Sequence, residues 1–217
     1  MNDHEDKQGE YASAPCYAHE LDPLYRDLAA PDSDTRRDVM RWRKAERERL
    51  RALRNALDAG QRAGALLSVS EQLDQLLQTS EASVLGGYWP IHHELDLRAW
   101  MRRQANAGMI IVLPVIHARN QPLRYSRWHP QGAMRRGPWG IAEPAEDDWL
   151  EPQMVLAPLL GVDQRSYRLG NGGGYFDRSL AATRPRPLAV GVGYHCARIT
   201  TIYPQAHDIP MDAVITG

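Results

Sequence analysis

Apolar residues recur at helical spacing in the early part of the chain and gather in short continuous runs later. Between residues 34 and 60 most positions are polar or charged, but Leu50, Leu53 and Leu57 fall at i, i+3 and i+7. This spacing places the three leucines on one face of a helix. Gly60 follows them, and glycine commonly ends a helix. The pattern therefore predicts one amphipathic helix that ends at Gly60.

Two further helices are predicted from the same kind of spacing. The stretch SEQLDQLLQ predicts a short helix with Ser70 as its N-cap. The stretch ELDLRAWMRRQANAG, residues 94–108, predicts another, with Leu97, Trp100 and Met101 on one face. Both helices should cover a sheet with their apolar sides.

The strands are predicted from short apolar runs that alternate with the helical segments. The run MIIVLPVI is almost continuously apolar, as expected for a strand buried on both faces. Alternation of strands and helices favours an α/β fold, here a single domain with a largely parallel sheet flanked by helices. The predicted strands cover residues 84–89, 109–116, 123–128, 154–160, 187–194 and 213–216.

Charge is distributed unevenly, although the 217-residue chain has a net charge of only −1. Residues 1–35 contain nine acidic residues against two basic ones, whereas residues 36–54 contain nine basic residues against three acidic ones. We interpret residues 1–35 as a polar, acidic extension and residues 36–217 as the α/β domain. The near-neutral total does not favour a general nucleic-acid binder, but the basic helix at 36–54 keeps RNA or nucleotide binding as an alternative.

The composition places the chain in a reducing compartment. Cys16 and Cys196 are the two cysteines, and they form no CxxC pair, so neither a disulfide framework nor a thiolate metal site is indicated. No apolar run reaches the roughly 18 residues of a membrane span, and the polar N-terminus is unlike a signal peptide. We therefore expect a cytoplasmic protein, monomeric and without membrane or nucleic-acid partners.

The stretch RLGNGGGYFDR, residues 168–178, carries the strongest chemical signal. It follows a predicted strand and leads into a predicted helix near Tyr175, a position where α/β proteins bind ligands. Glycines allow backbone N–H groups to approach an anion, and Arg168 and Arg178 could add charged hydrogen bonds. Asp177 could hold Mg²⁺. The loop matches neither the P-loop nor the GxGxxG pattern, so composition alone also allows a mobile surface loop.

These residues, together with four other segments, resemble the 5-formyltetrahydrofolate cyclo-ligase family. The other segments are RERLR, GYWPIHHELD, GPWGIAEP and the ending HDIPMDAVIT, in the family's order. The resemblance covers residues 36–217. It implies a ligase of one-carbon metabolism that converts 5-formyltetrahydrofolate and ATP to 5,10-methenyltetrahydrofolate, ADP and phosphate with Mg²⁺. The implied route has the formyl oxygen attack the γ-phosphate, after which N10 of the folate displaces phosphate.

The resemblance also implies a role for individual residues. ATP would be bound by two helix arginines and by the glycine loop, while Mg²⁺ would be held by two aspartates. The folate would be bound by one acid, by three aromatic residues and by the same loop, and three loop residues would be catalytic. The ATP set is Arg47, Arg51, Arg168, Gly170, Asn171, Gly172, Gly173, Gly174, Tyr175, Phe176 and Arg178; the metal set is Asp177 and Asp208; the folate set is Tyr88, Glu94, Trp139, Asn171, Gly172, Gly173, Gly174 and Tyr175; the catalytic set is Arg168, Tyr175 and Asp177.

Simpler interpretations of several residues stay open at this point. Arg47 and Arg51 could lie on a solvated helix face, and Glu94 could be a helix N-terminal acid favoured by the dipole. Trp139 could fill the core. Asn171 departs from the family, which often has an aromatic, methionine or basic residue at that position. A relative that keeps the fold without catalysis, and binds RNA or a nucleotide through helix 36–54, is the alternative function.

Overall fold

We analysed a computed structural model of the chain, which describes residues 33–217. Most of the predicted extension 1–35, and Cys16 with it, therefore lies outside the described residues. The chain forms two compact units that divide between Arg49 and Leu50, within the first helix. The boundary at residue 35 stays a prediction.

Four α-helices and two short 3₁₀ helices occur between residues 33 and 217. The first two α-helices precede the sheet, and the other two each connect a pair of its strands. They are α1 (Ser33–Ala56), α2 (Ala59–Gln78), α3 (Arg98–Asn106) and α4 (Tyr175–Ala182), with η3 (Pro138–Gly140) and η4 (His195–Ala197).

The junction between α1 and α2 corrects two sequence predictions. The predicted end at Gly60 is wrong, because α1 ends at Ala56 and Gly60 lies in the first turn of α2. Asp58 caps α2 by accepting the Gln61 N–H at 2.8 Å, and the Gln61 side chain accepts the Asp58 N–H in return. The predicted start at Ser70 is also wrong, because this capping box begins the helix earlier and leaves Ser70 in its buried middle.

The predicted apolar stripe of α1 is wrong at Leu53, and Leu57 lies beyond the end of the helix at Ala56. Leu50 is buried with Leu160 and Leu169, but Leu53 is 41% exposed and Arg54 is only 3% exposed. Leu50 and Arg54 are four residues apart, so they lie on the same helix face. The buried face of α1 therefore contains a charged residue where the sequence pattern predicted a leucine.

The predicted helix at 94–108 is shorter than expected. The described α3 begins at Arg98, and Glu94 lies in the preceding turn. The interpretation of Glu94 as a helix N-terminal acid is therefore wrong. Leu97, Trp100 and Met101 are all buried, as predicted.

The central sheet has six strands in the order β10-β9-β6-β1-β2-β3. All neighbouring pairs are parallel except β2 and β3, which are antiparallel. This confirms the predicted α/β fold with a largely parallel sheet. The strands are β1 (Val84–Gly86), β2 (Ile110–Val115), β3 (Arg124–Trp128), β6 (Met154–Pro158), β9 (Leu188–Gly193) and β10 (Ala213–Thr216); β4 (Met134–Arg136) pairs with β5 (Ala142–Pro144), and β7 (Gly161–Val162) pairs with β8 (Arg168–Leu169).

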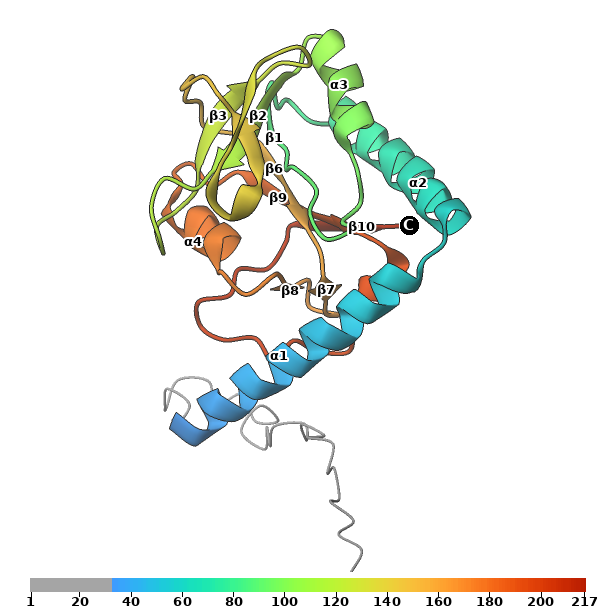
Figure 1. The fold of residues 1–217 in the computed structure, drawn as a ribbon, viewed down its shortest axis with the longest axis vertical. Helices are drawn as coiled ribbons and strands as arrows, with labels where there is room; N and C mark the ends of the chain where they lie inside the picture. Colours follow the sequence, from blue (N-terminus) through green and yellow to red (C-terminus); the bar gives the residue numbers. More distant parts are fainter. Residues whose placement is uncertain (1–32) are drawn as a thin grey trace, which may run out of the picture. The chain divides into compact units, whose positions relative to one another are not determined.

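Both faces of the sheet are buried, as the apolar runs predicted. Ile111 and Leu113 of β2 pack with Trp100 of α3 on one face, and Val112 between them packs with Tyr125 on the other. Alternate residues of a strand point to opposite faces, so each face receives its own apolar cluster. Figure 1 shows α2 and α3 along one side of the sheet and α4 on the other.

The strand order reverses between β1 and β6. The chain leaves β1 through α3 to reach β2 on one side, and it leaves β6 through α4 to reach β9 on the other. Ligands in open α/β sheets bind outside the carboxyl ends of the strands at such a switch point. We therefore expect a ligand site to involve the segments that follow β1 and β6.

Candidate active site

The segment after β1 presents Glu94 in a tight turn. The Ile91 N–H donates to Glu94 Oε2 at 3.0 Å, and the side chain is almost fully buried. His92 and His93 in this turn have φ values of 48° and 60°, which are unfavourable for residues with a Cβ. Such local strain is common at functional sites. Burial raises the pKa of the Glu94 carboxyl.

Asn171 joins the glycine loop to Glu94. Its Nδ2 donates to Glu94 Oε1 at 3.1 Å, and its Oδ1 accepts from Arg51 Nη2 at 3.5 Å. Residues from three separate segments, the end of α1, the turn after β1 and the glycine loop, therefore meet at one point. The position at which this chain departs from the resembled family is the one that makes the link.

The glycine loop uses backbone conformations that favour glycine. Gly172 has φ 103° and Gly174 has φ 63°, and Gly174 directly precedes α4. The Arg178 side chain reaches back to donate to the Gly173 carbonyl, and its guanidinium lies 4.9 Å from the Tyr175 ring centre. The first turn of α4 begins directly after these glycines, and its backbone N–H groups, like those of any helix N-terminus, have no helical acceptors and can face an anion.

Arg168 and Asp177 form a buried pair beneath this loop. Arg168 Nη2 lies 3.4 Å from Asp177 Oδ2, and the guanidinium lies 4.9 Å from the Phe176 ring centre. The Nε atoms of Arg168 and Arg178 are buried, and neither has a hydrogen-bond acceptor within residues 33–217. Two cations with unused donors beside a glycine loop are suited to an anionic ligand such as a polyphosphate.

Asp177 is also tied to the segment that carries Asp208. The Ile209 N–H donates to Asp177 Oδ1 at 3.2 Å, and the Gln205 N–H donates to Asp208 Oδ2 at 2.6 Å. Carboxylates are the side chains that Mg²⁺ takes in proteins, usually one or two of them with phosphate and water oxygens completing its shell. Across the described chain, no group of three or more His, Cys, Asp or Glu side chains is arranged so that it could hold a metal ion.

The three predicted aromatic contacts lie in different environments. Tyr88 is buried and its hydroxyl donates to the Leu95 carbonyl at 2.6 Å. Trp139, at the tip between β4 and β5, is 71% exposed, and its ring meets Tyr175 edge-on at 5.7 Å between centres. The interpretation of Trp139 as a core residue is therefore wrong. Its indole and the Tyr175 ring are placed to cover one side of the loop.

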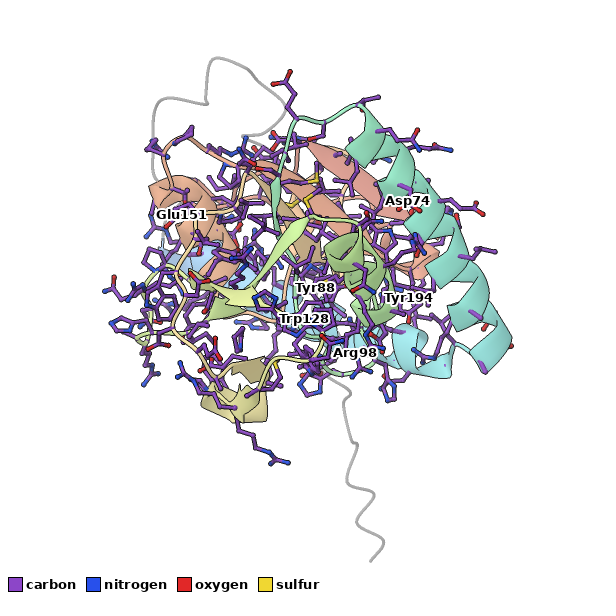
Figure 2. The ribbon with its side chains drawn as sticks, turned by 90° about the horizontal axis from the view of Figure 1, so that it is seen from above. Asp74, Tyr88, Arg98, Trp128, Glu151 and Tyr194 are labelled. Atoms are coloured by element: carbon purple, nitrogen blue, oxygen red, sulfur yellow. The ribbon has the colours of Figure 1, made fainter. Side chains whose placement is uncertain are left out.

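A cleft of about 360 Å³ opens beside Glu94. It is lined by the turn after β1, by Arg62 of α2, by Arg98 of α3 and by Tyr194 after β9. Figure 2 shows Tyr88, Arg98 and Tyr194 in the same part of the molecule. The cleft gives a small molecule access to the turn that holds Glu94.

Arg47 and Arg54 are two arginines of α1 that lie in different compact units. Arg47 lies in α1 but in the other compact unit, so its predicted ATP contact stays a prediction. Arg54 was missed by the sequence analysis, although it lies close enough to Glu94 to affect its pKa. The available signal was its spacing of four residues from Leu50, which places it on the buried helix face.

Comparison with known proteins decides the family. A model of the 5-formyltetrahydrofolate cyclo-ligase family matches residues 39–217. The chain belongs to this family. The predicted resemblance is confirmed, and so is the prediction that the chain is an enzyme, specifically a ligase of folate chemistry. The alternative of a non-catalytic relative is therefore not favoured.

Individual cyclo-ligases show the same relationship. The Haemophilus influenzae 5-formyltetrahydrofolate cyclo-ligase is 26% identical over 182 residues, which cover 81% of this chain and 97% of that protein. The Escherichia coli K12 cyclo-ligase is 31% identical over 130 residues, which cover 57% of this chain and 71% of that protein. Both matches are to proteins with the family's name.

Solved structures of family members share the fold. The Aquifex aeolicus 5,10-methenyltetrahydrofolate synthetase superimposes with a TM-score of 0.70 at 26% identity, covering 80% of this chain and 89% of that one. A Mycoplasma pneumoniae 5,10-methenyltetrahydrofolate synthetase gives 0.65 at 20% identity, covering 80% and 97%. Among the helices that the structure describes, none combines the length and apolarity needed to cross a bilayer.

Proposed function

We propose that this chain catalyses the ATP- and Mg²⁺-dependent conversion of 5-formyltetrahydrofolate to 5,10-methenyltetrahydrofolate, with release of ADP and phosphate. One observation carries the proposal: Asn171 of the glycine loop donates a hydrogen bond to Glu94. The loop suited to bind phosphate therefore lies beside the carboxylate suited to bind a pterin. A reaction between a phosphate and a folate needs these two binding regions side by side.

The folate would be held through Glu94. A carboxylate can accept parallel hydrogen bonds from the N3–H and the 2-amino group of the amino-pyrimidinone edge. Glu94 is buried, so these bonds would form away from competing water. The Trp139 and Tyr175 rings, which meet edge-on, would pack against the rest of the folate.

The triphosphate would be held by the glycine loop, by the first turn of α4 and by Arg51, Arg168 and Arg178. Phosphoryl transfer depends mainly on positioning and on neutralising charge, which these groups supply. Asp177 and Asp208 would hold Mg²⁺, which neutralises charge on the phosphate oxygens when bound. Tyr175, Arg168 and Asp177 would lie nearest the reacting groups.

In the proposed reaction the formyl oxygen attacks the γ-phosphorus, an O–P bond forms, and the bond to ADP breaks. N10 then attacks the activated formyl carbon, a C–N bond forms, the C–O bond to phosphate breaks, and the N10 proton is released. The residues that hold the folate and the triphosphate would only bind and orient the two substrates. No covalent bond to the protein is required.

A spectrophotometric assay tests the proposal. Purified protein, 5-formyltetrahydrofolate and Mg-ATP should produce the absorbance of methenyltetrahydrofolate only when ATP is present. Asp177→Asn should lower kcat at least about 100-fold. The substitution removes the negative charge that pairs with Arg168 and that would hold the metal. Asp147→Asn is the matched control, since Asp147 pairs with Arg135 at 3.1 Å outside this loop and should leave the rate unchanged. No product from the unaltered protein under any ATP concentration would refute the proposal.

A further inference from the structure

The Arg54 guanidinium is a buried cation that has no hydrogen-bond acceptor within residues 33–217. Its side chain lies at the end of α1 and the residue is 3% exposed. Nε, Nη1 and Nη2 are all buried, and none of the three has an acceptor within the residues that the structure describes. A buried charge that lacks hydrogen bonds is costly to a fold. Such a residue calls for an explanation other than stability.

The charge that faces Arg54 is Glu94. Among the charged groups near Arg54, Glu94 is the strongest one that favours its ionised form. In return, Arg54 is the strongest cation acting on Glu94 and works against the burial that raises the pKa of that carboxyl. The two groups interact through space, because the hydrogen bonds of Glu94 come from Ile91 and Asn171.

The other groups around Glu94 have roles of their own. Arg168 is paired with Asp177, Arg62 donates to the Arg54 carbonyl at 2.7 Å, and the Tyr88 hydroxyl donates to Leu95. Arg54 is the buried cation near Glu94 whose side chain is bound to nothing else in residues 33–217. The charged, titratable or polar groups that face Glu94 or line its cleft are Arg54, Arg62, Tyr88, His92, His93, Asp96, Arg98, Arg168, Asn171 and Tyr194.

We propose that Arg54 is a positioning residue that keeps Glu94 ionised inside the buried site. An ionised carboxylate accepts hydrogen bonds with both oxygens, whereas a protonated one carries a donor and would oppose an incoming N–H. The link to substrate binding rests on the proposed function, but the effect of Arg54 on Glu94 does not. Without Arg54, Glu94 should take up a proton at a higher pH.

A titration of Glu94 tests the proposal without any substrate. The full chain is labelled with ¹³C at glutamate side-chain carbons, and Glu94→Gln assigns the Glu94 resonance by its disappearance. Arg54→Met should raise the titration midpoint of Glu94 by at least about one pH unit. Arg54→Lys, which keeps the charge, should stay close to the unaltered protein. Equal midpoints in the unaltered protein and in Arg54→Met would overturn the proposal.

Binding of 5-formyltetrahydrofolate as a function of pH extends the test. At a pH midway between two Glu94 midpoints that lie one unit apart, Arg54→Met should bind the folate about threefold more weakly than the unaltered protein, and well below both midpoints about tenfold more weakly. The affinity should return at higher pH. A purely structural role would instead weaken binding equally at every pH and lower the Tm, and that result would also overturn the proposal.

Two controls keep the outcomes distinct. Arg103→Met makes the same substitution on α3, where Arg103 pairs with Asp74 at 2.5 Å, and should change neither the Glu94 midpoint nor folate affinity. If Arg54→Met does not fold, Arg54→Gln removes the charge while keeping a polar head and makes the same comparison. An unaltered protein that binds no folate at any pH would refute the proposed function, whereas the titration would still decide the role of Arg54.

Discussion

Two carboxylates in this chain are equally buried but differ in how they are bound. Asp163 and Glu94 are each 7% exposed. Asp163 accepts three main-chain N–H groups, from Arg165 at 2.9 Å, Tyr167 at 3.0 Å and Ile202 at 3.2 Å. Glu94 accepts one main-chain N–H and one side-chain amide, and it faces the Arg54 guanidinium, which has no acceptor in the described part of the chain.

The difference separates a structural acid from one prepared for a ligand. The three donors of Asp163 fix the β7–β8 hairpin to the segment at Ile202, and they leave little capacity for another molecule. Glu94 lies at a cleft, and one of its two donors, Asn171, belongs to a glycine loop. Burial alone therefore does not identify a functional acid, whereas incomplete hydrogen bonding beside a cleft does.

The largest expected effect is on stability at Asp163. Asp163→Ala should lower the free energy of unfolding by about 3–4 kcal/mol, because three N–H groups lose their acceptor. Urea denaturation measures the change, and Asp163→Asn, which keeps an acceptor oxygen, should lose less. Asp147→Ala is the control, since its side chain is 57% exposed. A loss below about 1 kcal/mol at Asp163 would remove the contrast with Glu94.

Glu94 should show the opposite balance, a large loss of binding with a smaller loss of stability. Glu94→Gln should raise KM for 5-formyltetrahydrofolate about 10- to 100-fold, which corresponds to the roughly 1.5–3 kcal/mol of a hydrogen bond to a charged group. An unchanged KM would place the folate elsewhere.

The stability of Glu94→Gln follows from the sign of the pKa change. The pKa of Glu94 in the folded chain lies above its ordinary value. Protonation of Glu94 therefore stabilises the fold, and this contribution is present below the unfolded pKa and is lost as the pH rises through the folded pKa. At pH 8 the unaltered protein carries the cost of an ionised buried acid. Glu94→Gln removes this cost but also removes the charge that faces Arg54, so its Tm at pH 8 should fall less than that of Asp163→Ala.

The smallest expected effect is at Asn171, which joins the two halves of the site. Asn171→Ala removes one neutral donor to Glu94 and should raise KM for the folate about two- to tenfold. Steady-state kinetics measure the change, with Asn106→Ala at the end of α3 as the control. A loss beyond about 100-fold would mean that Asn171 takes part in the chemistry itself.

Much of the fold could be predicted from the sequence because strands buried on both faces leave a clear signal. The run at 109–116 predicted β2, and the alternation of runs with helices predicted the parallel sheet. Helix ends were predicted less well, because a capping box at Asp58 outweighed the glycine that follows it. The antiparallel direction of β3 was not predicted, although the short connection at residues 116–123 leaves no room for the crossover that a parallel pair needs.

The site could be predicted in its parts but not in its arrangement. The glycine loop, Asp177 and Glu94 were found from short motifs, and the switch-point rule explains why the segments carrying them meet. The burial of Arg54 was not predicted, because a charged residue on an amphipathic helix is expected to face solvent and its spacing from Leu50 was the one sign against this. The packing of the last turns of α1 shows that both Leu50 and Arg54 are buried on that face.

The position of β1 and β6 at the centre of the sheet has a consequence for hydrogen exchange. Both strands have neighbours on each side and are almost fully buried. Their amides should open only with global unfolding, whereas amides of the glycine loop should exchange through local openings. Slowly exchanging strands and a readily exchanging loop would then belong to the same domain, so the loop can close on its ligands while the centre of the sheet stays fixed.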